Sequence, residues 1–92
     1  MTTVTLMWEA RAVEGRAGEL LEWARARTLP YAPLRRETFR AAQDRVLVLT
    51  WWEADAVDAD LPELPEPAAE MITRPVHRWR FESVSLAEGA TS

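Results

Sequence analysis

The chain has 92 residues and a net charge of −4, with 48 % hydrophobic and 28 % charged residues and five Trp. A chain of this length predicts a single domain, and this content of large apolar residues excludes an intrinsically disordered protein. The chain contains no Cys, which excludes disulfides and thiol chemistry, and its acidic balance argues against nucleic acid and anionic membranes as partners.

The N-terminal sequence indicates the compartment. The opening residues MTTVTLMWEARAVEG lack the basic start and the long apolar core of a signal peptide. No apolar run approaches the roughly 20 residues that a membrane span needs. We therefore expect a cytoplasmic protein that does not associate with membranes.

The first two elements are predicted to be a strand and a helix. Apolar residues alternate through Thr3–Ala12, which predicts a strand with Val4, Leu6 and Trp8 on one face. Gly15–Leu29 places its apolar residues at helical spacing, which predicts an amphipathic helix. The proline that comes after it ends this helix, because its ring cannot continue it.

A β-hairpin is predicted next. Arg35–Ala42 and Arg45–Glu53 both read as strands, and Asp44 is the turn former between them. The second of these strands is apolar on both faces, as expected of a strand in the centre of a sheet.

The rest of the chain is predicted to be a loop, a short helix and a strand. The segment LPELPEP, Leu61–Pro67, contains three prolines and therefore suits neither a helix nor a central strand. Pro67–Arg74 predicts a short helix, and Val76–Leu86 predicts the last strand. The domain is expected to span residues 1–86, with residues 87–92 as a disordered tail.

This order, β-α-β-β-α-β, predicts a ferredoxin-like α+β fold. Its first and third strands are the most apolar and are placed in the centre of the sheet, which gives the strand order 4-1-3-2. Four arginines on the two edge strands are interpreted as solvated charges that block further strand pairing: Arg36, Arg40, Arg78 and Arg80. Helices cover one face, so a second copy of the chain is expected to cover the other and form a homodimer.

The chain resembles the dimeric α+β barrel superfamily and, within it, the antibiotic biosynthesis monooxygenase-like proteins. The resemblance extends over Thr3–Val84 and rests on VTLMWEARAVEGRAGELLEWA, RRETFRAAQDRVLVLTWWEAD and HRWRFESV, with the pair Trp52–Glu53 at the end of the third strand. It implies a homodimer formed through the sheets. Members include cofactor-free oxygenases of polycyclic phenols, haem-degrading enzymes, polyketide cyclases and proteins without known activity.

The chain departs from that family pattern in two respects. It contains no Asn, whereas the quinone-forming oxygenases and the haem-degrading members use an active-site Asn. Its second helix is interrupted by LPELPEP, whereas in the family that helix helps to wall the ligand cavity. The cavity here is therefore expected to be small, open, or covered by a Pro-rich loop.

His77 is the candidate catalytic residue. It is the only histidine, and histidine is the one side chain whose ordinary pKa lies near neutrality. It shares a strand face with Trp79 and Phe81, so it is a candidate general base for a phenol or enol proton beside aromatic walls. The alternative is a strand histidine at the dimer interface or near solvent.

The tryptophans are candidates for the walls of an aromatic site. Trp51 and Trp52 point to opposite faces of their strand, and the sequence does not decide which of them faces a cavity. Trp52, Trp79 and Trp23 are taken as walls, since Trp offers a large stacking surface. Tyr31 is a candidate hydrogen-bond donor to a ligand oxygen. The alternative reading assigns the tryptophans to the core and the interface and Tyr31 to anchoring of its loop.

Two functions remain open at this point. The first is a homodimer that binds a small aromatic or polyketide-like metabolite between sheet and helices and, by resemblance, acts as a cofactor-independent monooxygenase or cyclase. The second is a non-catalytic dimeric accessory or regulatory module. With one His, no Cys and no spaced carboxylate motif, we expect no metal site and no cofactor, an axial haem ligand at His77 being the one alternative.

Overall fold

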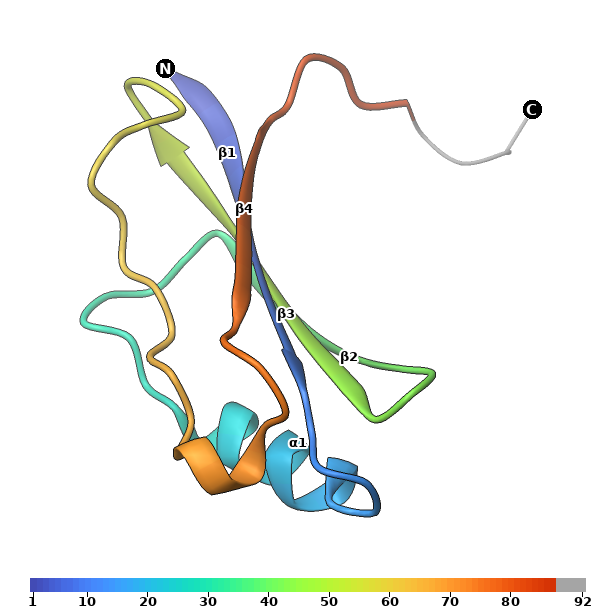
Figure 1. Ribbon diagram of the computed structural model, residues 1–92. Helices are drawn as coiled ribbons and strands as arrows, with labels where there is room; N and C mark the ends of the chain where they lie inside the picture. The colour runs from blue at the N-terminus through green and yellow to red at the C-terminus, as the bar shows by residue number, and fades with distance from the viewer. Residues whose placement is uncertain (88–92) are drawn as a thin grey trace.

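The computed structural model describes residues 1–87, which form one antiparallel sheet with a helix and two long loops on one side (Figure 1). The tail expected at residues 87–92 lies, apart from Ala87, outside the described residues. The elements in chain order are β1 (Thr2–Arg11), α1 (Ala17–Ala26), β2 (Arg35–Ala41), β3 (Arg45–Ala54), the single-turn 3₁₀ helix η1 (Ala69–Met71) and β4 (His77–Glu82).

The strand order is β2-β3-β1-β4, which is the predicted 4-1-3-2 order read from the β2 edge. All three pairings are antiparallel. The central strands β1 and β3 pair over their whole length, from Thr2 opposite Ala54 to Arg11 opposite Arg45. The hairpin turn places Gln43 and Asp44 at φ of 64° and 59°, a conformation that Asn and Asp tolerate better than most residues. The architecture is thus a small α+β domain compatible with a ferredoxin-like fold.

One face of the sheet, here called the covered face, carries the hydrophobic core. Val4, Trp8, Val46 and Val48 point to this face and are buried, as the alternation in the first strand predicted for Val4 and Trp8. The core beneath Trp8 packs against Leu20 of α1, which is fully buried. A second cluster on the same face consists of four buried side chains: Val4, Leu6, Trp52 and Ala54.

Helix α1 is shorter than the predicted Gly15–Leu29. Its last turn ends at Ala26, where the chain becomes extended. The guanidinium of Arg36, on the adjacent β2, donates hydrogen bonds of 2.8 Å to the carbonyls of Ala24 and Arg27. Carbonyls at the end of a helix lack partners within it, so this arginine supplies them. Arg36 is therefore a helix cap, and its interpretation as a solvated charge was wrong.

The second predicted helix, Pro67–Arg74, is also wrong, because only the single turn η1 forms. Its residues pair instead with the end of β1: the amide of Val13 donates to the carbonyl of Met71, and that of Thr73 donates to the carbonyl of Arg11. Extended pairing with β1 satisfies these backbone groups, and the flanking prolines leave too few residues for a stable helix.

A long loop, residues 55–68, takes the place of the missing helix and crosses the covered face. Arg78 donates to the carbonyl of Leu64 at 2.6 Å, and Arg80 donates to that of Ala59 at 2.6 Å. Trp8 donates from its indole to the carbonyl of Pro65 at 3.1 Å. Side chains therefore satisfy the carbonyls of a Pro-rich segment that has no strand partner. Arg78 is exposed as expected of a solvated charge, but it and the half-buried Arg80 also bind this loop, a role that the sequence did not predict.

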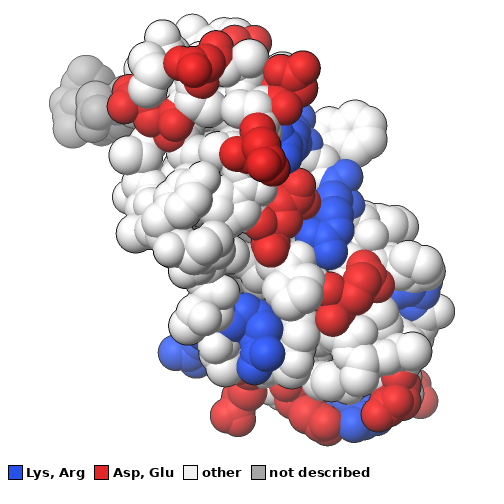
Figure 2. Space-filling model, turned by 90° about the vertical axis from the view of Figure 1, so that its left-hand side faces the viewer, with Lys and Arg blue, Asp and Glu red and all other residues white. Residues whose placement is uncertain are grey.

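Figure 2 views the side on which this loop lies. Acidic side chains gather at the upper end of this view. The loop that comes after β3 contains three aspartates, Asp55, Asp58 and Asp60. Below the upper end, basic and acidic side chains alternate in the picture. Arg80 and Glu63 form an ion pair of 3.0 Å between β4 and the loop.

The last strand is also shorter than the predicted Val76–Leu86. It ends at Glu82, which lies opposite Val4, near the beginning of β1 at Thr2. The amide of Ser83 still donates to the carbonyl of Thr3 at 2.9 Å. Beyond that contact, Val84 and Leu86 are 90 % and 88 % exposed.

The other face of the sheet, here called the open face, is bare in the described part of the chain (Figure 1). The strand registers place three rows of side chains across it: Phe39, Leu47, Glu9 and His77; Glu37, Leu49, Met7 and Trp79; Arg35, Trp51, Thr5 and Phe81. The centre of this face is therefore apolar, and charges lie toward its margins.

Residues 1–87 contain no helix that is both long enough and apolar enough to cross a membrane.

Candidate functional site

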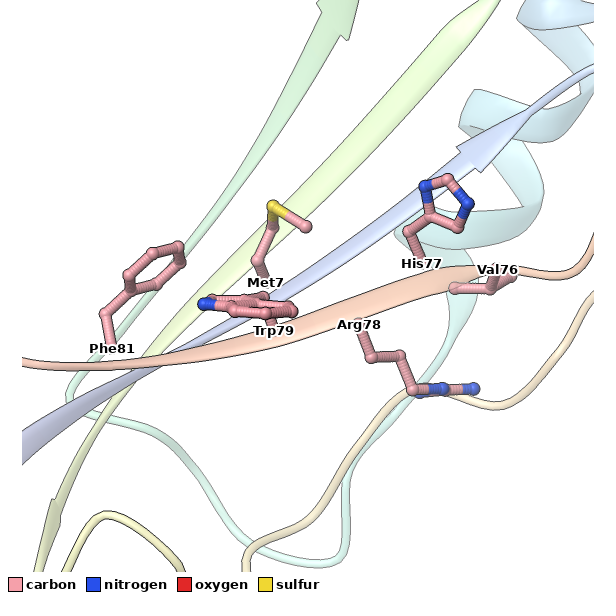
Figure 3. A pocket seen from close by; sticks show the side chains of 6 residues that line it. All are labelled: Met7, Val76, His77, Arg78, Trp79 and Phe81. Atoms are coloured by element: carbon pink, nitrogen blue, oxygen red, sulfur yellow. The ribbon is translucent and has the colours of Figure 1, made fainter.

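A pocket of about 580 Å³ opens at the β4 edge of the open face (Figure 3). Its lining comes from β1 and β4 and the residue before β4: Met7, Val76, His77, Arg78, Trp79 and Phe81. Figure 3 shows Met7, His77, Trp79 and Phe81 on one side of the β4 ribbon and the side chain of Arg78 on the other. The guanidinium of Arg78 thus reaches toward the Pro-rich loop, whereas the other four define the concave surface.

The aromatic part of the pocket is highly exposed for side chains of this size. Trp79 is 65 % exposed and Phe81 is 47 % exposed. Trp79 lies opposite Met7 and Phe81 lies opposite Thr5 across the β1–β4 pair. Because β4 is the last strand of the sheet, no further strand lies beside either aromatic ring on its outer side. Exposed apolar surface of this kind commonly marks a binding site.

His77 lies at one end of the pocket beside a carboxylate. Its Nδ1 atom is 3.3 Å from Oε1 of Glu9, the residue opposite it on β1. The His77 side chain is 61 % exposed, whereas Glu9 is buried. The imidazole is therefore open to a ligand, and its buried neighbour is fixed.

Two arginines hold Glu9 in place. Arg74 donates to Oε1 at 2.7 Å, and Arg45 donates to Oε2 at 3.4 Å. Burial by itself raises the pKa of the Glu9 carboxyl, but the hydrogen bond from Arg74 and the charges of Arg74 and His77 together lower it by more. The net direction is a pKa below the ordinary value of 4.5, so Glu9 is ionised at neutral pH.

A fixed carboxylate beside an exposed imidazole suits proton transfer. Nδ1 is the ring nitrogen beside Glu9, which leaves Nε2 on the far side of the ring, and Glu9 supplies a fixed negative charge next to the imidazole. A carboxylate beside a histidine is a recurrent element of acid–base sites. The pair is thus chemically competent as a base and its positioning group.

The structure divides the predicted site residues between the two faces. His77, Trp79 and Phe81 come together at the pocket. Trp52 is buried on the covered face, where its indole donates to the hydroxyl of Thr50 at 2.9 Å. Tyr31 meets Trp52 edge to face, with ring centroids 5.4 Å apart. Trp52 and Tyr31 therefore cannot line one cavity with Trp79.

Trp23 also lies away from the pocket. Its ring stacks on that of buried Trp8, with centroids 6.1 Å apart, and the guanidinium of Arg27 lies 4.6 Å from its centroid. Such contacts are typical of a side chain that closes the edge of a core. The predicted wall of Trp52, Trp79 and Trp23 is thus not assembled at one place.

The strand register determines which of the two adjacent tryptophans faces the core. Trp52 faces the core, and Trp51 lies on the open face opposite Thr5. The guanidinium of Arg35 lies 5.0 Å from the Trp51 ring centroid, and its Nη2 atom is 2.6 Å from Oε1 of Glu37. Trp51 is therefore part of the apolar surface that adjoins the pocket.

The sequence alone does not connect Met7, Glu9 or Arg74 with His77. Glu9 is one of several carboxylates at strand ends, and its spacing from His77 carries no signal. The connecting information is the β1–β4 register, which sets Glu9 opposite His77 and Met7 opposite Trp79. The predicted strand order makes β1 and β4 neighbours, but a shift of one residue between them would send His77 to the covered face, away from Glu9.

Within residues 1–87, no group of three or more His, Asp or Glu side chains is arranged to hold a metal ion. Comparison of the chain with family models, with curated proteins and with solved structures finds no match.

Proposed function

We propose that this protein binds a flat aromatic metabolite in the pocket on the open face and works as a homodimer. The observation that supports this proposal best is the combination of exposed Trp79 and Phe81 with His77 and Glu9 along one pocket. A pocket of about 580 Å³ has the size of a small-molecule site, and its apolar walls with one polar end are typical of such sites.

The chemistry that we propose is removal of a phenol or enol proton by His77. The ring would lie against Trp79, and its hydroxyl would reach the imidazole, which Glu9 orients. The resemblance to cofactor-free oxygenases and cyclases suggests two fates for the anion. It either reacts with O₂, which requires an electron-rich substrate, or closes a ring onto another part of the same molecule. His77 and Glu9 would replace the Asn-based arrangement of that family, since this chain has no Asn.

A homodimer fits the composition of the open face. Phe39 and Phe81 are exposed at opposite edges, and the half-buried Leu47, Leu49 and Trp51 lie between them. An exposed apolar surface that spans the sheet from edge to edge is typical of a protein–protein interface. A second copy seated on the β2–β3 half would leave the β4 edge as the mouth of the pocket.

A second candidate function is a non-catalytic dimeric module. The observation that favours it is the packed covered face, where Trp8 stacks on Trp23 and Trp52 is buried beside Tyr31. In this case the aromatic residues of both faces serve packing alone, and Trp79 is an interface residue.

A pair of variants distinguishes a ligand site on the open face from one on the covered face. Trp79→Leu removes the exposed ring of the pocket, and Tyr31→Leu removes a ring that is 55 % exposed on the covered side. We would measure the affinity of each variant for a panel of bicyclic phenols by calorimetry. Contacts between aromatic rings contribute about 1 kcal/mol or more, so Trp79→Leu should weaken binding about tenfold.

The proposed site requires that Tyr31→Leu binds as the parent does. Loss of binding in Tyr31→Leu alone would move the site to the covered face. Absence of binding by the parent chain, with a stable dimer, would support the non-catalytic module instead.

A further inference from the structure

The end of the open face at which His77 lies is rich in positive charge. Arg11 and Arg45 lie opposite each other on β1 and β3, and Arg74 and His77 flank the same corner. Glu9 is in contact with Arg45, Arg74 and His77. Two guanidinium groups and one imidazole thus share a single carboxylate, in a chain whose net charge is −4.

Glu66, a carboxylate of the neighbouring loop, has its partners elsewhere. Glu66 accepts a hydrogen bond from the amide of Val76 at 3.1 Å and lies 3.8 Å from Arg78, whose side chain points away from the open face. Arg11 is exposed and has no ion-pair partner within residues 1–87. Positive charge in excess of its counter-ions attracts anions to a partly buried surface.

The positive corner adjoins the aromatic surface at His77, although Arg74 itself does not line the pocket. Arg74 and His77 contact the same oxygen of Glu9, so an anion that reaches the imidazole also lies in the field of Arg74. Trp79 comes two residues after His77 on the same strand face, which corresponds to roughly 6.6 Å at ~3.3 Å per residue. That distance matches a ring system resting on Trp79 with an acidic group attached at its His77 end.

We propose that the ligand of the pocket is a hydroxylated aromatic carboxylic acid with two fused rings. Its rings lie on Trp79 and Phe81, its hydroxyl reaches His77, and its carboxylate lies on the side of His77 that adjoins Arg74. This inference rests on the proposed function and adds the charge of the ligand to it. The carboxylate accepts charge-assisted hydrogen bonds, and the rings bury the exposed aromatic surface.

The test compares an acid with a neutral molecule of the same shape. We would titrate the intact protein with 2-naphthoate and with 2-naphthalenemethanol by calorimetry at neutral pH. The acid should bind on the order of tenfold more tightly than the alcohol, because charge-assisted hydrogen bonds are roughly twice as strong as neutral ones. Added salt should reduce this preference, since the corner is partly exposed.

Variants of the arginines show which side chain causes the preference for the acid over the alcohol. Arg74→Gln should reduce the binding of the acid to nearly that of the alcohol and leave the alcohol unchanged. Arg45→Gln gives a second, milder variant if Arg74→Gln folds poorly, because Arg45 makes only a 3.4 Å contact with Glu9. Arg35→Gln is the matched control: Arg35 lies on the same face, over Trp51, away from the positive corner.

The outcomes separate this inference from the proposed function. Equal affinity for the acid and the alcohol would overturn the acid preference and leave an aromatic site in place. Absence of binding by both probes would overturn both proposals. An acid preference that Arg35→Gln abolishes and Arg74→Gln does not would place the anion elsewhere and contradict the assignment.

Discussion

His77 Nδ1 lies 3.3 Å from Glu9 Oε1, and this contact joins the last strand of the sheet to the first. The buried carboxylate is fixed by Arg74 at 2.7 Å, whereas the imidazole is largely exposed at the end of a pocket. A fixed, charged partner and an accessible base are the two features that a proton-transferring histidine needs.

The contacts of Glu9 predict how stability depends on pH. The pKa of Glu9 is lower in the folded chain than its ordinary value of 4.5, so its stabilisation is complete above that pH and is lost as the pH falls through the folded value. Glu9→Gln should therefore lower the free energy of unfolding by about 1–3 kcal/mol at pH 7, with the difference from the parent shrinking below pH 4.5.

Urea denaturation at pH 7 and at acidic pH measures this difference. Glu22→Gln is the control, because Glu22 is exposed on α1 and has no ion pair in the described part of the chain. A Glu9→Gln deficit that stays constant down to acidic pH would show that the carboxylate charge is not the stabilising feature.

His77 should matter for activity and not for stability. Its side chain is 61 % exposed and its one charged contact within residues 1–87 is with Glu9, so His77→Ala should change the free energy of unfolding by about 0.5 kcal/mol or less. Turnover of a phenolic substrate should fall on the order of 100-fold, the usual contribution of a general base. Unchanged turnover with an unchanged fold would remove His77 as the base.

The arginines of β4 should hold the Pro-rich loop. Arg78→Ala removes the 2.6 Å hydrogen bond to the Leu64 carbonyl and should destabilise the chain by about 1–3 kcal/mol, because a partly buried acceptor loses its charged donor. Limited proteolysis should then cut residues 55–68 faster than in the parent. Arg25→Ala, an exposed arginine of α1, should change neither property, and equal protection of the loop in Arg78→Ala would contradict this role.

The open face should be the dimer interface. Leu49 lies half-buried in the central row of that face, so Leu49→Glu should leave the fold intact and shift the protein toward a monomer by at least about tenfold in Kd, because a buried unpaired charge is costly. Sedimentation equilibrium measures this shift. Leu34→Glu, at a 65 % exposed loop position, is the control, and a similar response of both variants would contradict the assignment of the interface.

The alternation of apolar residues in the first strand predicted its buried face correctly, and the apolar content of the third strand predicted its central place. Val4, Leu6 and Trp8 are buried as a set, and the apolar third strand is central. These predictions held because burial on a sheet face repeats every two residues, and the repeat is visible in the sequence. The helix at Pro67–Arg74 failed because its residues pair with β1, and that long-range pairing leaves no local signal.

The candidate site could be predicted only in part. His77, Trp79 and Phe81 share a face because they alternate along one strand, which the sequence shows directly. Glu9 and Arg74 reach His77 through strand register and a loop, and both depend on the tertiary fold. Trp52 was assigned to the same site, but its side chain is buried in the core. Two adjacent tryptophans on a central strand give no local sign of which one is buried.

The location of the ligand site is tested most directly by the indole N–H signals of the five tryptophans in a two-dimensional ¹H–¹⁵N NMR titration with a bicyclic aromatic compound. Trp79 lies in the pocket, Trp51 adjoins it on the open face, and Trp8 and Trp52 are buried on the covered face. We predict that the Trp79 signal shifts saturably while the Trp8 and Trp52 signals stay in place. Saturable shifts of Trp8 and Trp52 with an unchanged Trp79 signal would contradict a ligand site on the open face.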